Sequence, residues 1–296
     1  IFVVFFYIYG NINKEKFINT IENNYNYKIR IVGSNISLDR FYKNVDTVSI
    51  LKDLIEISSP IDSEKIIFIW PEGILPNISQ KELANYKWLF SENFNKNHIL
   101  ILGMNNQSIN NGSKKFFNSF SVYDGELNLL HSYNKINLVP FGEFLPFEKI
   151  LNKIGLKSLT NNHQSFSKGE SREIIEINKK NFSIKVLPLI CYEIIYSGKL
   201  FNKPHFDVII NISEDGWFGQ SIGPKQHFVH SIFRATENGK YVLRSSNNGI
   251  AAIINPLGYV EKRVKPGQSG FVDFKKNKKI QPTIFSIYGN KIFGLL

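Results

Sequence analysis

The chain has 296 residues, 43% of them hydrophobic, and no linker-like break, so we expect one large domain. A single cysteine excludes an internal disulfide framework and any zinc or iron–sulfur site built from several cysteines. The net charge of +11 is spread along the chain and clusters only at Lys275, Lys276, Lys278 and Lys279. No zinc-finger, helix-turn-helix or RNA-recognition pattern accompanies it, so we expect no nucleic-acid partner. The basic surface is either simply solvated or attracts an anionic membrane.

Both ends of the chain are apolar. Residues 1–9 carry no charge, and residues 284–296 become apolar as the chain stops. Each falls short of the roughly 20 residues that a helix needs to span a bilayer. We expect residues 1–10 to be the tail of one transmembrane helix and residues 284–296 the start of another, around a catalytic domain at 25–280. A strand at one end and a packed tail at the other are the alternative.

The first half of the chain alternates strands with helices. Residues 28–32 are typical of a strand, and two apolar runs predict buried strands, at 66–70 and 99–103. Apolar residues at helical spacing predict two helices, over 46–57 and 82–94. The dipeptide Asp124-Gly125 lies between two apolar runs and therefore predicts a hairpin.

The second half begins with a polar loop, residues 151–169, which we interpret as a possible lid. A second hairpin (173–177 and 182–187) is followed by a short helix (194–202), a buried strand (207–212) and a helix (226–237) closed by Gly239. Four more strands are predicted, at 241–244, 250–254, 259–264 and 270–274. This order predicts an α/β fold, with a mixed sheet or two sheets back to back and helices outside.

Three polar residues beside predicted buried strands form a chemical set for covalent catalysis. Glu72 follows Trp70-Pro71, Lys135 lies after the first hairpin, and Cys191 ends an apolar run. Ligands collect at the carboxyl ends of strands in α/β sheets. A thiol nucleophile needs a base, which a glutamate can supply. An acyl-transfer oxyanion needs donors, which Lys135 and the backbone N–H of Tyr192 can supply.

Each residue also has a simpler explanation. A lone cysteine is usually a small buried hydrophobe. Glu72 could be an acid at a helix start, and Lys135 could be a surface lysine. His227 and His230 have the i, i+3 spacing of a metal pair, but no third ligand has matching spacing. We therefore expect a structural role for these histidines, and neither a metal nor a cofactor.

In their order, these short motifs resemble the Glu–Lys–Cys signature of the nitrilase, or carbon–nitrogen hydrolase, superfamily. They are Trp70-Pro-Glu72, Lys135 ahead of Val139-Pro-Phe-Gly-Glu143, and Cys191-Tyr-Glu193. Longer stretches resemble the apolipoprotein N-acyltransferase family within it, namely residues 134–146, 215–227, 234–240 and 244–249. The resemblance implies a four-layer α-β-β-α sandwich on the periplasmic side of a bacterial inner membrane.

The resemblance also implies roles for particular residues. Glu72 would be the general base, Lys135 the oxyanion and orienting group, and Cys191 the nucleophile. Supporting positions would be Glu143, Tyr192 and Glu193. Candidates for substrate-binding loops are Tyr42, Phe144, Trp217 and Phe218. The chain departs from the family pattern at Gly216, where alanine is usual, and at Phe41-Tyr42, where a tryptophan is usual.

The implied reaction moves a fatty acyl group from a membrane phospholipid to the α-amine of a diacylglyceryl-cysteine apolipoprotein. A thioester on Cys191 would carry the acyl group, and a lid from residues 151–169 or Trp217-Phe218 would exclude water. The family has several transmembrane helices upstream, of which this sequence shows at most a remnant. Two alternatives remain open: a soluble nitrilase-type amidase and an inactive, membrane-associated remnant.

Overall fold

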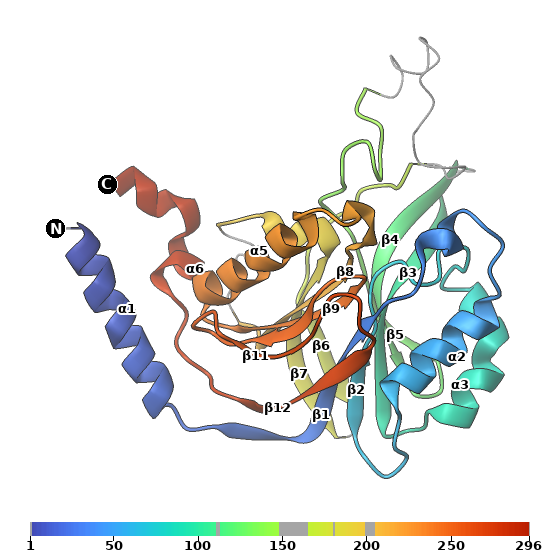
Figure 1. Cartoon of the computed structure of the whole chain (residues 1–296), viewed down its shortest axis with the longest axis horizontal. Helices are drawn as coiled ribbons and strands as arrows, with labels where there is room; N and C mark the ends of the chain where they lie inside the picture. Colours follow the sequence, from blue (N-terminus) through green and yellow to red (C-terminus); the bar gives the residue numbers. More distant parts are fainter. Residues whose placement is uncertain (1, 111–112, 148–164, 180, 199–204, 296) are drawn as a thin grey trace.

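Twelve strands of the described residues form one hydrogen-bonded sheet that folds into two halves, called the first and second sheets below, joined where β1 pairs with β9 (Figure 1). The computed structural model describes residues 2–110, 113–147, 165–179, 181–198 and 205–295. The first sheet holds β1 Asn23–Ser34, β2 Ile66–Ile69, β3 His98–Asn110, β4 Ser113–Asp124, β5 Leu129–Asn134 and β12 Gly270–Asn277. The second holds β6 Ile175–Lys179, β7 Phe182–Ile190, β8 Val208–Glu214, β9 Tyr241–Asn247, β10 Ala251–Ile254 and β11 Val260–Val264.

Strand direction brings several carboxyl ends to one edge of the molecule. β1, β2 and β3 are mutually parallel, and so are β7, β8 and β9. The two sheets connect where β1 pairs with β9 in parallel, through Gly33–Ser246 and Ser34–Asn247. β5 is antiparallel to β4, which is antiparallel to β3, so β5 also ends at this edge. The ends of β2, β5 and β7 therefore face a common region.

Helices cover the outer face of each sheet. α2 Thr47–Ser58 and α3 Lys87–Asn93 lie on the first sheet, and α5 Gly223–Asn238 lies on the second (Figure 1). α2 begins where the Asp46 carboxylate accepts from the N–H groups of Val48 and Ser49, at 3.1 and 3.2 Å. α5 ends at Gly239, whose φ of +62° suits glycine. α1 Phe2–Asn19 and α6 Ile284–Tyr288 flank this body.

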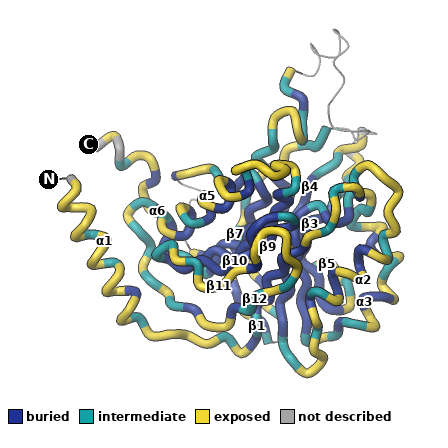
Figure 2. The backbone as a smooth tube through the Cα atoms, in the orientation of Figure 1, coloured by how far each residue is buried: buried dark blue, intermediate teal, exposed yellow. Residues whose placement is uncertain are grey.

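Three hydrophobic cores separate four layers. Along β2, Ile67 and Ile69 point into the core between the sheets, whereas Ile66 and Phe68 point toward α2 and α3. β8 alternates in the same way, with Ile209 packed under α5. This period of two is what a strand buried on both faces requires. Figure 2 shows the buried sheets between more exposed helices, and the layer order is α, β, β, α.

The predicted α/β fold is confirmed, including the hairpin at Asp124-Gly125, where four residues separate the end of β4 from the start of β5. Two local predictions were wrong. Residues 82–94 divide into a short 3₁₀ helix, Glu82–Tyr86, and α3. Of the helix expected over 194–202, residues 199–202 lie outside the described residues; the described part holds a 3₁₀ helix at Cys191–Ile195, and Tyr196 is already extended. β7 ends at Ile190, where the apolar run ends, so the helical turn begins three residues before the predicted start at 194.

The chain ends differ from the core in exposure. α1 continues to Asn19, well beyond the predicted residues 1–10, and its first turns are solvent-exposed (Figure 2). Among the described residues, no helix combines the length and hydropathy needed to cross a membrane. Most of the expected lid, residues 151–164, lies outside the described residues. Its described end is tied down, because the N–H of Gly169 donates to the carbonyl of Lys135 at 2.8 Å.

Candidate active site

The three predicted catalytic residues lie at the common edge of the two sheets. Pro71 ends the run after β2, and Glu72 follows; Lys135 comes directly after β5, and Cys191 directly after β7. All three are buried, with Lys135 only 1% exposed. Gly103 on β3 allows Glu72 to approach closely, because a Cβ there would lie 2.7 Å from the Glu72 Cα. The structure therefore brings the predicted set together.

Lys135 lies between two carboxylates. Its Nζ donates to Glu143 Oε1 at 2.9 Å and to Glu72 Oε1 at 3.3 Å. Asn118 on β4 donates its Nδ2 to the same two oxygens, at 2.8 and 2.7 Å respectively. The other carboxylate oxygens accept from backbone N–H groups, those of Glu214 (to Glu72, 3.1 Å) and Val139 (to Glu143, 2.8 Å). Both carboxylates are thus fully hydrogen-bonded and held in place.

The charges of the site decide which groups carry protons. Burial raises the pKa of the Cys191 thiol well above its ordinary value, the charge of Glu72 raises it further, and Lys135 opposes both effects. Burial alone would lower the pKa of Lys135, but the charges of Glu143 and Glu72 raise it well above the ordinary value. At neutral pH the sulfur is therefore a thiol and Lys135 an ammonium. A base must remove the thiol proton before the sulfur can attack.

The backbone at Cys191 is strained. Its φ of +47° lies in the left-handed region, which costs a non-glycine residue on the order of 1–3 kcal/mol. Two hydrogen bonds support this conformation. The Ile190 N–H donates to Glu193 Oε2 at 2.9 Å, and His227 Nε2–H donates to the Cys191 carbonyl at 3.1 Å. A sharp, strained exit from a strand is how other nucleophiles are presented at a sheet edge.

Glu193 connects the cysteine segment to the lysine segment. It is fully buried, and its Oε2 holds the end of β7 through Ile190. Its Oε1 accepts from the Ile136 N–H at 3.0 Å, beside Lys135, and from Arg172 Nη2 at 2.7 Å. Further donors to the same oxygen are the Tyr133 hydroxyl at 2.7 Å and the Asn137 N–H at 3.2 Å. One carboxylate therefore sets the distance between two predicted catalytic loops.

The aromatic candidates lie in loops of the same edge and differ in exposure. Trp217 and Phe218 are 51% and 41% exposed; Trp217 packs on Phe41, with ring centroids 4.6 Å apart. Phe218 contacts the His227 ring at 5.5 Å. Tyr42 is 59% exposed, and Phe144 is half-buried directly after Glu143. Half-buried Tyr192 places its ring edge-on to Tyr196, 5.6 Å away.

A buried charged network next to Cys191 was not predicted. Arg244 Nη2 donates to both oxygens of Asp215, at 2.9 and 2.8 Å, and Asp215 Oδ1 lies 2.8 Å from His227 Nδ1. Burial alone would raise the pKa of Asp215, but the charge of Arg244 and the contact with His227 hold it below the ordinary value. A buried pair of Arg40 and Glu214 lies in the same region.

Only weak sequence signals marked these residues. An arginine within the apolar run of β9 suggests a buried acidic partner, without saying which one. Asn118 interrupts a phenylalanine-rich strand, which indicates that one face of β4 needs a hydrogen-bonding side chain. Among the described residues, no cluster of three His, Cys, Asp or Glu side chains could hold a metal ion. Both ring nitrogens of His227 instead contact protein groups, Asp215 and the Cys191 carbonyl.

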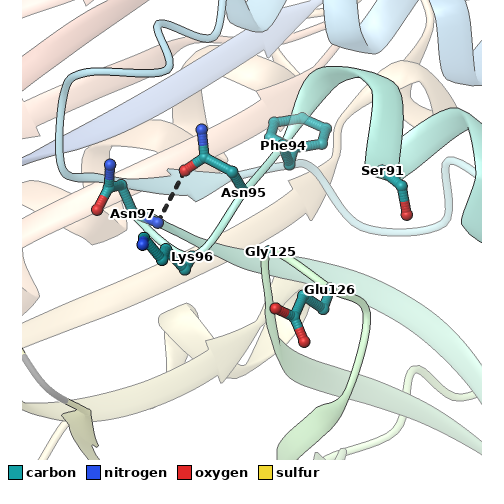
Figure 3. Close-up of a pocket in the computed structure, with 7 residues that line it drawn as sticks. All are labelled: Ser91, Phe94, Asn95, Lys96, Asn97, Gly125 and Glu126. Carbon is teal, nitrogen blue, oxygen red and sulfur yellow. Dashed lines mark hydrogen bonds between the residues drawn. The ribbon is translucent and has the colours of Figure 1, made fainter.

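A separate hollow lies away from this site. Its lining residues, shown in Figure 3, come from the end of α3, the turn into β3 and the turn after β4. They are Ser91, Phe94, Asn95, Lys96, Asn97, Gly125 and Glu126, around a volume of about 390 Å³. Because β3 begins there, this hollow is at the opposite edge of the sheet from Cys191. It contains none of the predicted site residues.

This chain shares its fold with solved structures, one of which is an amidase with an active-site cysteine. The amidase from Nesterenkonia sp. AN1 matches 83% of this chain and 92% of its own, with a TM-score of 0.51 at 12% identity. A CN-hydrolase superfamily protein from Xanthomonas campestris matches 85% and 90%, with a TM-score of 0.55 at 14% identity. The chain belongs to the carbon–nitrogen hydrolase family, whose sequence model matches residues 63–274.

Within this family, the chain is similar to apolipoprotein N-acyltransferases. It is 31% identical to that of Bradyrhizobium diazoefficiens over 276 residues, 89% of this chain and 50% of the relative. It is 36% identical to that of Rickettsia typhi over 242 residues, 80% of this chain and 47% of the relative. The resemblance found in the motifs is thus confirmed. The chain spans about half the length of the curated relatives it matches.

Proposed function

We propose that this chain transfers a fatty acyl group from a membrane phospholipid to the α-amine of a diacylglyceryl-cysteine apolipoprotein. The observation that carries the chemistry is the buried cluster in which Lys135 Nζ bridges Glu72 and Glu143 beside the Cys191 thiol. Similarity to N-acyltransferases over 80–89% of the chain supports an amine, rather than water, as the acceptor.

In the first half-reaction, the Glu72 carboxylate takes the proton of the Cys191 thiol as the sulfur attacks the ester carbonyl carbon. The carbonyl oxygen becomes an oxyanion, which the Lys135 ammonium and the Tyr192 N–H stabilise. The carbon–oxygen bond to the glycerol then breaks, and its oxygen takes the proton back from Glu72. A lysophospholipid leaves, and Cys191 carries the acyl group as a thioester.

In the second half-reaction, the neutral α-amine of the apolipoprotein attacks the thioester carbonyl. Glu72 takes a proton from the attacking nitrogen, and the same two donors hold the second oxyanion. The carbon–sulfur bond breaks, the sulfur receives the proton from Glu72, and an amide has formed. Glu143 keeps Lys135 oriented throughout, since it makes the shorter of the two ion contacts, at 2.9 Å.

The exposed aromatic residues suit a long acyl chain. Exposed aromatic rings lie near the site, at Trp217, Phe218 and Tyr42. Single exposed hydrophobic residues are common on protein surfaces, but several together favour the binding of an apolar ligand. We propose that they, with Phe144, contact the acyl group and help to exclude water. Water exclusion matters because hydrolysis of the thioester competes with transfer to the amine.

The chain ends support a membrane setting. Residues 3–8 of α1 are each at least 52% exposed although all are apolar or aromatic. In water such a surface is unfavourable, but it suits a bilayer. We propose that residues 1–10 and 284–296 mark the membrane boundaries of a catalytic domain, 25–280, on the periplasmic side of a bacterial inner membrane. Tryptophan fluorescence of Trp88→Phe with brominated lipids would test this: Trp70 is buried, so quenching would show that Trp217 faces the bilayer, and unchanged fluorescence would contradict the proposal.

A mass-spectrometric experiment tests the function. The chain is mixed with phospholipid vesicles and its intact mass is measured, with and without hydroxylamine. The proposal expects a fatty-acyl adduct that hydroxylamine removes, that is absent from Cys191→Ala, and that a diacylglyceryl-cysteine peptide discharges as an N-acyl product. Turnover of small amides without any lipid-derived adduct would instead identify an amidase.

A further inference from the structure

His227 joins a buried ion pair to the backbone of Cys191, although no step of the proposed reaction uses it. It lies on α5 and is 5% exposed. One ring nitrogen, Nε2, is 3.1 Å from the Cys191 carbonyl oxygen, and the other, Nδ1, is 2.8 Å from Asp215 Oδ1. A side chain fixed at both ends and touching the nucleophile's own peptide group requires a reason beyond packing.

The direction of the first contact follows from its partner. A carbonyl oxygen can only accept a hydrogen bond, so Nε2 carries a proton and donates it to Cys191. Nδ1 then faces Asp215 and, at 3.2 Å, Arg244 Nη2. Because Arg244 holds Asp215 through both oxygens, the ring orientation is set by fully buried charges.

The carbonyl of Cys191 and the N–H of Tyr192 belong to the same peptide group. No peptide bond among the described residues is cis, so this C=O and N–H point to opposite sides of the chain. A donor held on the carbonyl therefore fixes the direction of the N–H. It also polarises the group, which strengthens the N–H as a donor. The φ of +47° at Cys191 shows that this backbone needs such support.

We propose that His227 is a positioning residue that aims the Tyr192 N–H at the oxyanion formed on Cys191. This inference rests on the proposed function only in one respect: the Cys191 sulfur must attack an acyl carbonyl group. His227 acts through the Cys191–Tyr192 peptide. Asp215 and Arg244 hold the ring that holds the peptide.

Two substitutions separate the two ends of the ring. In His227→Gln the amide nitrogen reaches about as far as Nε2, so it can still donate to the Cys191 carbonyl while the contact with Asp215 is lost. In His227→Asn the amide reaches only as far as Nδ1, so Asp215 keeps a partner and the carbonyl loses its donor. His230→Asn is the matched control, because His230 lies one turn further on the same helix and packs on Phe233.

Two reactions of Cys191 report on different features. Acylation by p-nitrophenyl butyrate passes through an oxyanion, whereas alkylation by iodoacetamide displaces iodide and forms none. We expect His227→Asn to slow acylation about 10²-fold, the size of effect seen when an oxyanion donor is lost, and to change alkylation less than about threefold. His227→Gln should acylate within about tenfold of wild type, and His230→Asn at the wild-type rate.

Three results would overturn the inference. Acylation of His227→Asn at the wild-type rate would show that the hydrogen bond is unimportant. An equal loss in acylation and alkylation would show that His227 only supports the structure around the sulfur. Acylation of His227→Gln slowed more than about tenfold would show that the restored donor is not enough; this last result decides the question even if His227→Asn does not fold.

The activated ester also separates this inference from the proposed function. It forms the same oxyanion at Cys191 without needing a membrane or a lipid. Wild-type chain that is acylated by the ester but not by phospholipid would refute the lipid substrate and leave the His227 comparison valid. Wild-type chain that the ester does not acylate would overturn the His227 inference itself.

Discussion

Replacing Lys135 by methionine tests the ion cluster at the centre of the site. Methionine keeps an unbranched side chain without the charge, so Lys135→Met leaves Glu72 and Glu143 facing each other with Asn118 as their shared donor. At contact distances of 2.9 and 3.3 Å, Coulomb's law with an effective dielectric constant near 20 gives a gross attraction of about 5–6 kcal/mol per contact. Desolvation offsets much of it, and removing one partner of a buried pair costs about 3–5 kcal/mol net.

Denaturant unfolding at two pH values measures this effect. At pH 8 we expect the free energy of unfolding of Lys135→Met to fall by about 3–5 kcal/mol relative to wild type. Two neighbouring carboxylates without their cation favour binding one proton, so the folded variant gains stability as the pH falls. The difference in free energy of unfolding between Lys135→Met and wild type should therefore be smaller at pH 5 than at pH 8. The matched control is Lys43→Met: Lys43 pairs with Asp39 at the surface, where the side chains are 68% and 54% exposed, and the change should stay under about 1 kcal/mol.

The reasoning would be refuted if Lys135→Met were as stable as wild type at pH 8. A deficit that grows on acidification would also refute it, because protonation should relieve repulsion between the two carboxylates. The sign agrees with the wild-type site, where the pKa of Lys135 is raised by Glu143 and Glu72 despite burial. That shift contributes stability which is fully present below the unfolded pKa of about 10.4 and is lost at higher pH.

Three further predictions concern neighbouring groups. Glu72→Gln should slow acylation of Cys191 about 10²–10⁴-fold by removing the base. The same change should also slow alkylation by iodoacetamide, because the same base must remove the thiol proton; wild-type rates of both reactions would contradict this. Glu193→Gln should lower the free energy of unfolding by about 3 kcal/mol, since it removes the buried charge that pairs with Arg172, whose side chain is only 11% exposed; an unchanged melting temperature would contradict it. The pKa of Asp215 is lowered, so its contribution to the free energy of unfolding is present above the unfolded pKa of about 3.9 and is lost as the pH falls below it. Asp215→Asn should therefore lose less stability on acidification than wild type does. An equally steep loss of stability at acid pH would argue against this.

Much of the backbone could be predicted because its signals are local. The run at 66–70 is apolar at every position, and β2 is buried on both faces as that pattern requires. Asp124-Gly125 marks its hairpin, and Gly239 closes α5 with positive φ. The edge shared by Glu72, Lys135 and Cys191 also followed from sequence, because each residue comes just after a strand or hairpin whose direction the fold class sets.

The contacts that hold the site could not be predicted in the same way. His227 reaches Cys191 across 36 residues of sequence, and Glu193 reaches Ile136 across 57. Such pairs depend on the register of neighbouring strands and on how one sheet sits against the other. A residue type alone says only that a buried polar group needs a partner. The early start of the 3₁₀ helix at Cys191 escaped prediction because a positive φ at a cysteine has no sequence signal.

The central claim is that Cys191 carries a fatty acyl group taken from a phospholipid. Intact-mass measurement of the chain after incubation with vesicles of one defined acyl composition tests it most directly. We expect a mass increase equal to that acyl group, removed by hydroxylamine and absent from Cys191→Ala. A wild-type chain that stays unmodified while its Cys191 is still acylated by p-nitrophenyl butyrate would contradict the claim.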